Sequence, residues 1–118
     1  MFLSNTSFAN VAASQTDANI VTAQDGKIIR VIGGFAVVAG TAMNLTFNSK
    51  GTGTGTAISS IIPCGANGGL VIPLPAQQDT GNPPFGYFRD TNKGEGLAVT
   101  TGAGASIVGI TLTYVTIG

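Results

Sequence analysis

The chain has 118 residues, the size of one ordinary domain. Hydrophobic residues make up 43% of it and charged residues only 8%, and the five basic and five acidic side chains cancel. Such a chain lacks the positive surface of proteins that bind nucleic acid or anionic lipid. Without histidine and with a single cysteine, it also lacks the commonest general base and any multi-cysteine zinc site. We therefore expect no nucleic acid or membrane partner, no metal and no cofactor.

The low charge has a second consequence. A neutral, weakly charged monomer is poorly soluble, because solubility depends on net charge. We therefore expect partners to cover much of this protein's surface. A membrane does not serve as that cover, because the longest apolar run, residues 31–39, is too short to span a bilayer and contains Gly33 and Gly34.

In chain order, the sequence predicts short strands separated by turns, since Gly, Thr, Val and Ile dominate and strong helix formers are scarce. Gly33 and Gly34 are expected to bend or bulge one strand, and Gln24-Asp25-Gly26 is expected to form a tight turn. The predicted strands are residues 8–13, 18–23, 27–32 with a continuation at 35–39, 43–48, 57–62, 70–72, 85–88, 96–101 and 107–117.

Two of these strands show which side chains face a core. In the strand at residues 43–48, Met43, Leu45 and Phe47 alternate with polar residues. In the last, one face is expected to carry Val108, Ile110, Leu112 and Tyr114, and the opposite face Ile107, Gly109, Thr111, Thr113 and Val115.

About eight or nine short strands at this spacing predict an all-β fold, an antiparallel β-sandwich of jelly-roll-like type. Residues 17–118 are expected to form this single sandwich. Two alternatives stand for residues 1–16: an N-terminal arm that docks on a neighbouring subunit or a capsid, or a first strand within the chain's own sheet.

The search for catalytic chemistry finds little. Paired carboxylates are needed to cleave a glycan, but we expect the acidic residues to be solvated side chains in turns. Residues 79–90 lack the Asp-x-Asp-x-Asp spacing of a calcium loop. The acidic residues are Asp17, Asp25, Asp79, Asp90 and Glu95.

Two further motifs resemble reactive sites only in part. Cys64 has no histidine to activate its thiol, so we expect a small packed or loop residue. The glycines at 51, 53 and 55 lack the following Lys-Ser/Thr of a phosphate-binding loop, so we expect a hairpin loop. The sequence therefore predicts that the protein is not an enzyme.

Apolar side chains indicate an interface instead. Three aromatic residues follow Pro83-Pro84, and they serve either as core and rim packing or as a subunit contact, where aromatics are enriched. Apolar residues also lie opposite the expected core at Ile28, Ile32, Ile61, Val71 and Ala98. With the apolar anchors of the N-terminal segment, the candidate capsid or subunit interface comprises Phe2, Leu3, Phe8, Val11, Phe85, Tyr87 and Phe88.

Four strand-and-turn motifs within residues 20–117 carry a family resemblance: residues 26–32, 68–75, 94–99 and 108–114. With them the chain resembles small virion proteins of tailed bacteriophages, particularly capsid decoration or cement proteins with a jelly-roll-like sandwich. It is also similar to domains of phage fibres and tail tips.

The resemblance implies a homotrimer seated on the major capsid protein, at the outer surface of a virion assembled in the host cytoplasm. The expected function is to bind and stabilise the assembled head. The alternative is a receptor-binding knob or a fibre or tail domain that contacts a host glycan.

Overall fold

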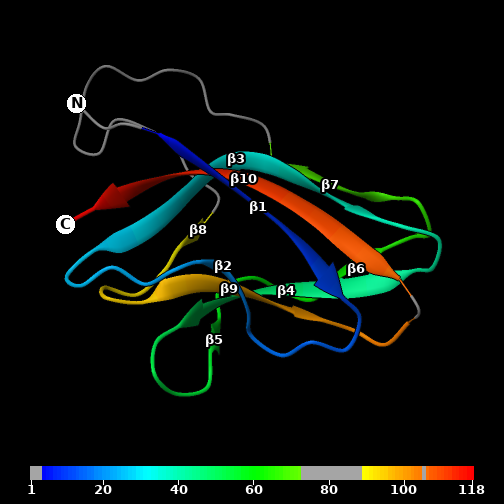
Figure 1. Ribbon diagram of the computed structural model, residues 1–118, viewed down its shortest axis with the longest axis horizontal. Coiled ribbons are helices and arrows are strands. Elements are labelled where there is room, and N and C mark those ends of the chain that lie inside the picture. The colour runs from blue at the N-terminus through cyan, green and yellow to red at the C-terminus, as the bar shows by residue number, and fades with distance from the viewer. Residues whose placement is uncertain (1–3, 73–88, 105) are drawn as a thin grey trace.

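The computed structural model describes residues 4–72, 89–104 and 106–118, and all the regular structure within them is β-strand. The ten strands form two antiparallel sheets, which lie one above the other in Figure 1. Sheet A contains, in spatial order, β1 (Asn5–Ala12), β10 (Ile107–Ile117), β3 (Ile28–Val38) and β7 (Gly69–Ile72), with β8 (Arg89–Asp90) also paired to β3. Sheet B contains β2 (Ala18–Val21), β9 (Gly96–Thr101) and β4 (Met43–Lys50), with β5 (Thr56–Ala57) and β6 (Ile62–Cys64) both paired to β4.

The connections give the fold its topology. The chain crosses from one sheet to the other between successive strands, except that β4, β5 and β6 stay in sheet B and β7 and β8 stay in sheet A. The order 1-10-3-7 therefore faces the order 2-9-4, with β5 and β6 both paired to the far edge of β4, which is the arrangement of a jelly roll. The predicted antiparallel, jelly-roll-like sandwich is confirmed.

The core lies between the sheets, where the predicted alternation places it. Met43, Leu45 and Phe47 of β4 are at most 2% exposed and face the buried side chains of β10 and β3. Each of the buried polar side chains in the described part of the chain has a hydrogen-bond partner. Thr101, for example, donates to Ala12 O at 2.7 Å and accepts from Gln15 N at 2.9 Å, which ties β9 to the turn between β1 and β2.

A bulge breaks the pairing of β10 with β3, at the glycine pair where the sequence predicts one. Thr113 pairs with Gly33 but Tyr114 pairs with Val31, so β3 has one residue more than β10 at this point. Gly34 has a φ of 134°, and a Cβ there would lie 2.3 Å from Thr111 O. Only glycine fits this close approach of the two strands.

The C-terminal strand β10 has the predicted faces except at Val115. Val108, Ile110 and Leu112 are buried in the core and Tyr114 packs against it, as the alternation predicts. Val115, expected on the opposite face, is nevertheless fully buried. Burial on both faces near this end of β10 is a feature that simple alternation does not reveal.

Other element boundaries differ from the predictions. Residues 57–62 do not form one strand: β5 ends at Ala57 and β6 begins at Ile62, because both pair with β4 and the chain loops out between them. The predicted strand at 85–88 lies outside the described residues. Residues 5–12, for which two alternatives stood, form β1 along the edge of the chain's own sheet A.

Replacing Gly34 by alanine should destabilise the protein by about 1–3 kcal/mol through backbone strain alone, and by more through the clash with Thr111 O. Gly53→Ala is the matched control, because a Cβ at Gly53 meets nothing within 4 Å and its φ is not in the left-handed region. Thermal or urea unfolding of both variants measures the difference. Equal stability of the two would contradict the proposed close approach of β3 and β10.

Candidate protein-binding face

The outer side of sheet A presents side chains in rows that run across its strands. In one row Phe8 of β1 pairs with Thr111 of β10, Thr111 with Phe35 of β3, and Phe35 with Val71 of β7. The adjacent row runs Asn10, Gly109, Val37 and Gly69. Antiparallel pairing in register places the members of each row side by side on the same face of the sheet.

The large apolar members of these rows are exposed to solvent. Phe8 is 78% exposed, Val71 76%, Ile107 54%, Val37 49% and Phe35 47%. We call the surface formed by these five side chains, with the small residues between them, the apolar face. A contiguous apolar patch on a sheet, in contrast to scattered single residues, is typical of a surface that contacts another protein.

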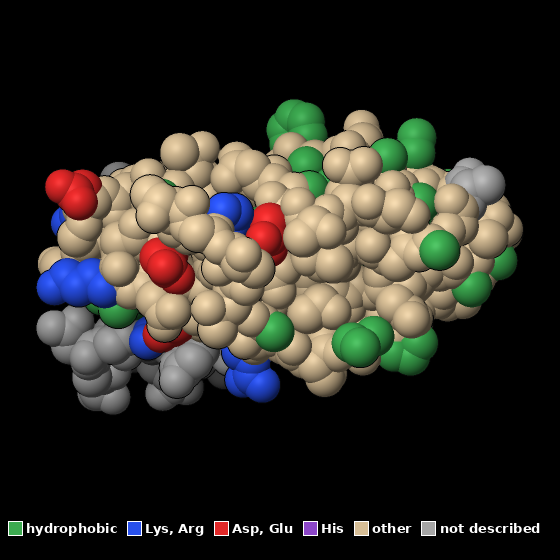
Figure 2. Space-filling view, turned by 90° about the horizontal axis from the view of Figure 1, so that it is seen from below, with side chains coloured by type: hydrophobic (Ala, Val, Ile, Leu, Met, Phe, Trp, Pro, Cys, Tyr) green, Lys and Arg blue, Asp and Glu red, His purple; other side chains and the backbone are tan. Residues whose placement is uncertain are grey.

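Charge is absent from this face and lies elsewhere. On the outer side of sheet A, no ionisable side chain occurs at the row positions of β1, β10 and β7, or of β3 after its bulge (residues 34–38). Figure 2 views the opposite side of the molecule, that of sheet B, where charged side chains gather over the left-hand part. The apolar face therefore offers a partner contacts without charges to desolvate.

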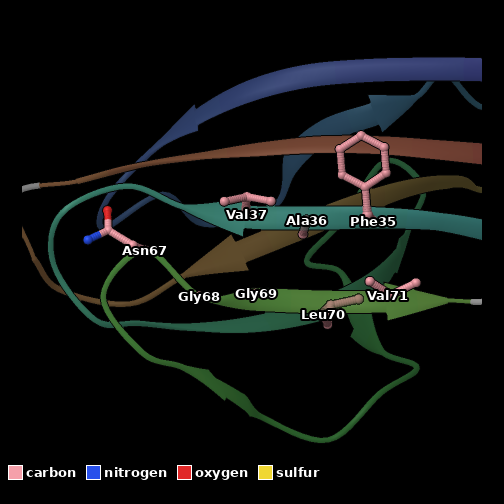
Figure 3. Close-up of a pocket in the computed structure, with 8 residues that line it drawn as sticks. All are labelled: Phe35, Ala36, Val37, Asn67, Gly68, Gly69, Leu70 and Val71. Atoms are coloured by element: carbon pink, nitrogen blue, oxygen red, sulfur yellow. The ribbon is translucent and has the colours of Figure 1, made fainter.

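A shallow pocket of about 350 Å³ opens on the apolar face between β3 and β7. Figure 3 shows Phe35 and Val37 of β3 and Val71 of β7 rising on the same side, whereas Ala36 and Leu70 point to the opposite side. Gly69 leaves the space beside Val37 without a side chain. The pocket is apolar and open, which suits an inserted hydrophobic side chain better than a small polar substrate.

The structure places the interface residues predicted from the sequence in different environments. Phe8 lies on the apolar face, where its ring is largely exposed. Val11, three residues further along β1, is 5% exposed and belongs to the chain's own core, since odd-numbered residues of β1 point inward. The remaining predicted residues, Phe2, Leu3, Phe85, Tyr87 and Phe88, lie outside the described residues.

Phe35, Val37 and Ile107 were not among the interface residues predicted from the sequence. For Phe35 and Val37 a signal is present, because residues 35–38 are apolar at every position, which is typical of a strand with two apolar faces. Among the apolar residues expected opposite the core, Val71 and Ile61 are exposed, whereas Ile32 and Ala98 are buried.

Three of the acidic residues, Asp17, Asp90 and Glu95, are held in polar contacts within the fold, rather than standing free in turns as expected. Asp25 is exposed in a turn, as expected, and Asp79 lies outside the described residues. Asp90 receives two hydrogen bonds from Arg30, at 2.7 and 2.8 Å, in a pair that links β8 to β3. Glu95 accepts from Ser49 Oγ at 2.6 Å and from Asn92 Nδ2 at 3.2 Å. These carboxylates position strands and turns.

Asp17 fixes the glycine-rich hairpin loop in the same way. Its carboxylate accepts from Asn48 Nδ2 at 2.8 Å and from Gly55 N at 2.9 Å. Its backbone N donates to Thr100 Oγ1 at 3.2 Å, and its φ of 53° is one that Asp tolerates better than most residues. Glycines 51, 53 and 55 thus lie in the hairpin loop that the sequence predicts, between β4 and β5.

Cys64 is buried at the end of β6, next to the core. Burial raises the pKa of its thiol above the usual value, which favours the unreactive protonated form. Within the described residues, no group of three or more acidic or cysteine side chains gathers where a metal ion would bind.

Comparison with protein-family models, with curated proteins and with solved structures finds no match to this chain. The fold class therefore follows from the strand order itself. Among the described residues, no helix is long and apolar enough to span a membrane.

Replacing Asp17 by alanine should lower the free energy of unfolding by about 1–3 kcal/mol, because two donors lose a charged acceptor and the left-handed φ becomes less favourable. Asp17→Asn, which keeps one acceptor oxygen and tolerates that φ, should lose less. Urea denaturation measures both variants, and the exposed turn residue Asp25, changed to alanine, serves as the control. Identical midpoints for Asp17→Ala and Asp25→Ala would refute this role.

The Cys64 thiol should react slowly with a thiol reagent in the native protein and rapidly after denaturation. Because the native pKa is raised, the thiolate fraction at mildly alkaline pH is smaller than that of a free cysteine, and the native rate should continue to rise at pH values where a free thiol is already ionised. Absorbance during labelling, followed against pH, measures this. A native rate equal to that of the unfolded chain would contradict the burial.

Proposed function

We propose that this protein is a structural component of a tailed-phage virion, a decoration protein that binds the outer surface of the assembled head as a symmetric oligomer. The observation that carries the proposal is the apolar face: five large hydrophobic side chains exposed on one sheet of a neutral protein. Burying them removes apolar surface from water, which favours association by about 25 cal/mol per Å². The proposed partners are the major capsid protein and further copies of this chain. The family resemblance implies that three copies form a homotrimer.

The polar side chains support a binding role over a catalytic one. The carboxylates of Asp17, Asp90 and Glu95 are each hydrogen-bonded to groups that hold the fold together. A general acid or base instead needs a side chain aimed at an open site with a pKa suited to proton transfer. The pocket on the apolar face is lined by hydrophobic side chains, glycines and one asparagine.

The exposed aromatic residues favour decoration over glycan recognition by a receptor-binding knob. Phe8 and Phe35 lie within strands on a sheet face, beside aliphatic Val71. Sugar recognition generally combines an aromatic platform with hydrogen-bonding side chains at the same site. The apolar face provides hydrophobic area without that polar set, which suits contact with protein.

The proposed mechanism is mass action. A protein that binds only the assembled shell stabilises that shell, by an amount set by its affinity and free concentration. Contacts that cross from one capsid subunit to another then oppose the outward pressure of packaged DNA. No chemical step is required, so the affinity and the number of bound copies determine the effect.

The test is to add the purified protein to heads of the encoding phage that were assembled without it. After gradient sedimentation, the copies bound per major capsid protein should saturate at a fixed lattice ratio, and heads carrying the protein should release their DNA at a higher temperature. Failure to co-sediment, or binding that rises without saturation, would overturn the proposal.

Matched variants locate the contact. Changing Phe35 and Val71 together to aspartate places charges on the apolar face and should lower the copies retained by at least about tenfold. Ile61→Asp is the control, because Ile61 is 66% exposed and apolar but lies in the loop before β6, away from this face. Equal losses in both variants would show that the apolar face plays no part in attachment.

A further inference from the structure

The apolar face has an unusual distribution of side-chain size along its two central strands, β10 and β3. In the row shared by Thr111 and Phe35, the large residue is on β3. In the next row Gly109 pairs with Val37, and again the large residue is on β3. Each of these rows thus carries one protruding side chain and one small one.

The third row repeats the pattern with the strands exchanged. Ile107 of β10 is 54% exposed and lies beside Ala39, whose backbone N donates to Ile107 O at 3.0 Å. Here the protruding side chain is on β10 and the small one follows β3. Three consecutive rows therefore each pair a bump with a hollow.

This arrangement makes the face complementary to itself. Consider a two-fold axis parallel to the strands, midway between β10 and β3 and just outside the sheet. It places β10 of one copy over β3 of the other and keeps every row over the same row. Phe35 then lies over the partner's Thr111, Val37 over the partner's Gly109 and Ile107 over the partner's Ala39, so each protruding side chain of these two strands meets a small one. An isologous contact of this kind closes after two copies.

The outer strands fit the same arrangement. The axis carries β1 of one copy over β7 of the other, which brings Phe8 to the pocket beside the partner's Val71. Two twisted sheets packed face to face cross at about 30°. Phe8 and Val71, the two most exposed side chains, thus meet at the edges of the contact, where the pocket beside Val71 leaves room for the ring of Phe8.

Charge and area are also compatible with a second copy as the occupant. The rows carry no ionisable side chain, so two identical faces meet without repulsion. Four strands and three rows give a footprint of about 20 by 15 Å at standard strand spacings. This is smaller than the roughly 800 Å² per partner of a standard interface, so the pairing is expected to be reversible.

We propose that the apolar face of sheet A pairs two copies of this chain face to face about a two-fold axis parallel to β10 and β3. The proposal rests on the self-association part of the proposed function but not on the phage head. It differs from the trimer that the family resemblance implies, because a three-fold contact joins two different surfaces of neighbouring subunits. Pairing buries the apolar face, so the loss of head attachment expected from aspartate at positions 35 and 71 then follows from the loss of the dimer.

Exchanging the residues of one row tests the symmetry directly. Phe35→Thr alone should weaken dimerisation by about 30-fold, the effect of removing a strong interface contact, and Thr111→Phe alone should weaken it through a clash with the partner's Phe35. The double variant Phe35→Thr with Thr111→Phe restores a large residue opposite a small one and should regain the dimer. Sedimentation equilibrium at micromolar concentration measures all four proteins, with thermal melting to confirm that each folds. Ile61→Asp, outside the face, should leave the dimer unchanged.

Chemical cross-linking between two single variants provides a second measurement. Phe8→Cys and Val71→Cys should each cross-link poorly with a short bis-maleimide when treated alone, because the axis places position 8 over the partner's position 71 and at the opposite edge from the partner's position 8. An equal mixture should yield a cross-linked heterodimer. The native Cys64 is buried and should stay unlinked in every sample.

The outcomes separate this proposal from the function proposed above. A dimer restored by the exchange and cross-linked only in the mixture supports the two-fold pairing, whether or not the protein binds heads. A monomer, a trimer, or a double variant no better than the single ones overturns the pairing. If heads still bind the protein at a fixed ratio in that case, the decoration function stands without it.

Discussion

The position of strand β10 between β1 and β3 is the constraint on which the rest of the structure depends. Its antiparallel pairing with both neighbours brings the two ends of the chain into one sheet. Because side chains alternate along a strand, the register that buries Val108, Ile110 and Leu112 also turns Ile107 and Thr111 outward. The core and the exposed apolar face are therefore two results of the same register, and a shift by one residue would exchange them.

Several of the protein's few charged side chains stabilise its fold through hydrogen bonds. Arg30 and Asp90 join β3 to β8, Glu95 binds Ser49 of β4, and Asp17 holds the hairpin loop by accepting a hydrogen bond from Gly55 N. Such half-buried contacts fix loops and strand ends, because leaving their partners unsatisfied costs more than the contact itself contributes. The outer row positions of sheet A carry no charged side chains, so no charge repulsion there keeps two identical molecules apart. This is the physical basis for proposing that assembly is the function.

Local sequence information was reliable where one periodicity governed a segment. Alternation in residues 43–48 identified the buried side of β4, and the Gly33-Gly34 pair identified the bulge in β3. It was unreliable where pairing partners decided the outcome. Residues 57–62 have the composition of one strand, yet the strand splits because two separate stretches of β4 receive its ends. Val11 resembles the other apolar residues near the N-terminus, yet it faces the core because β1 joins sheet A.

The sequence by itself determined the class of the fold. Glycine, threonine and β-branched residues at short intervals specify strands separated by turns. Only the tertiary structure decided that Phe8, Phe35 and Val71, far apart along the chain, form one row. Their neighbourhood depends on the long-range pairing of β1, β10, β3 and β7. That register is set by the packing of the whole core, and no local segment of the sequence encodes it.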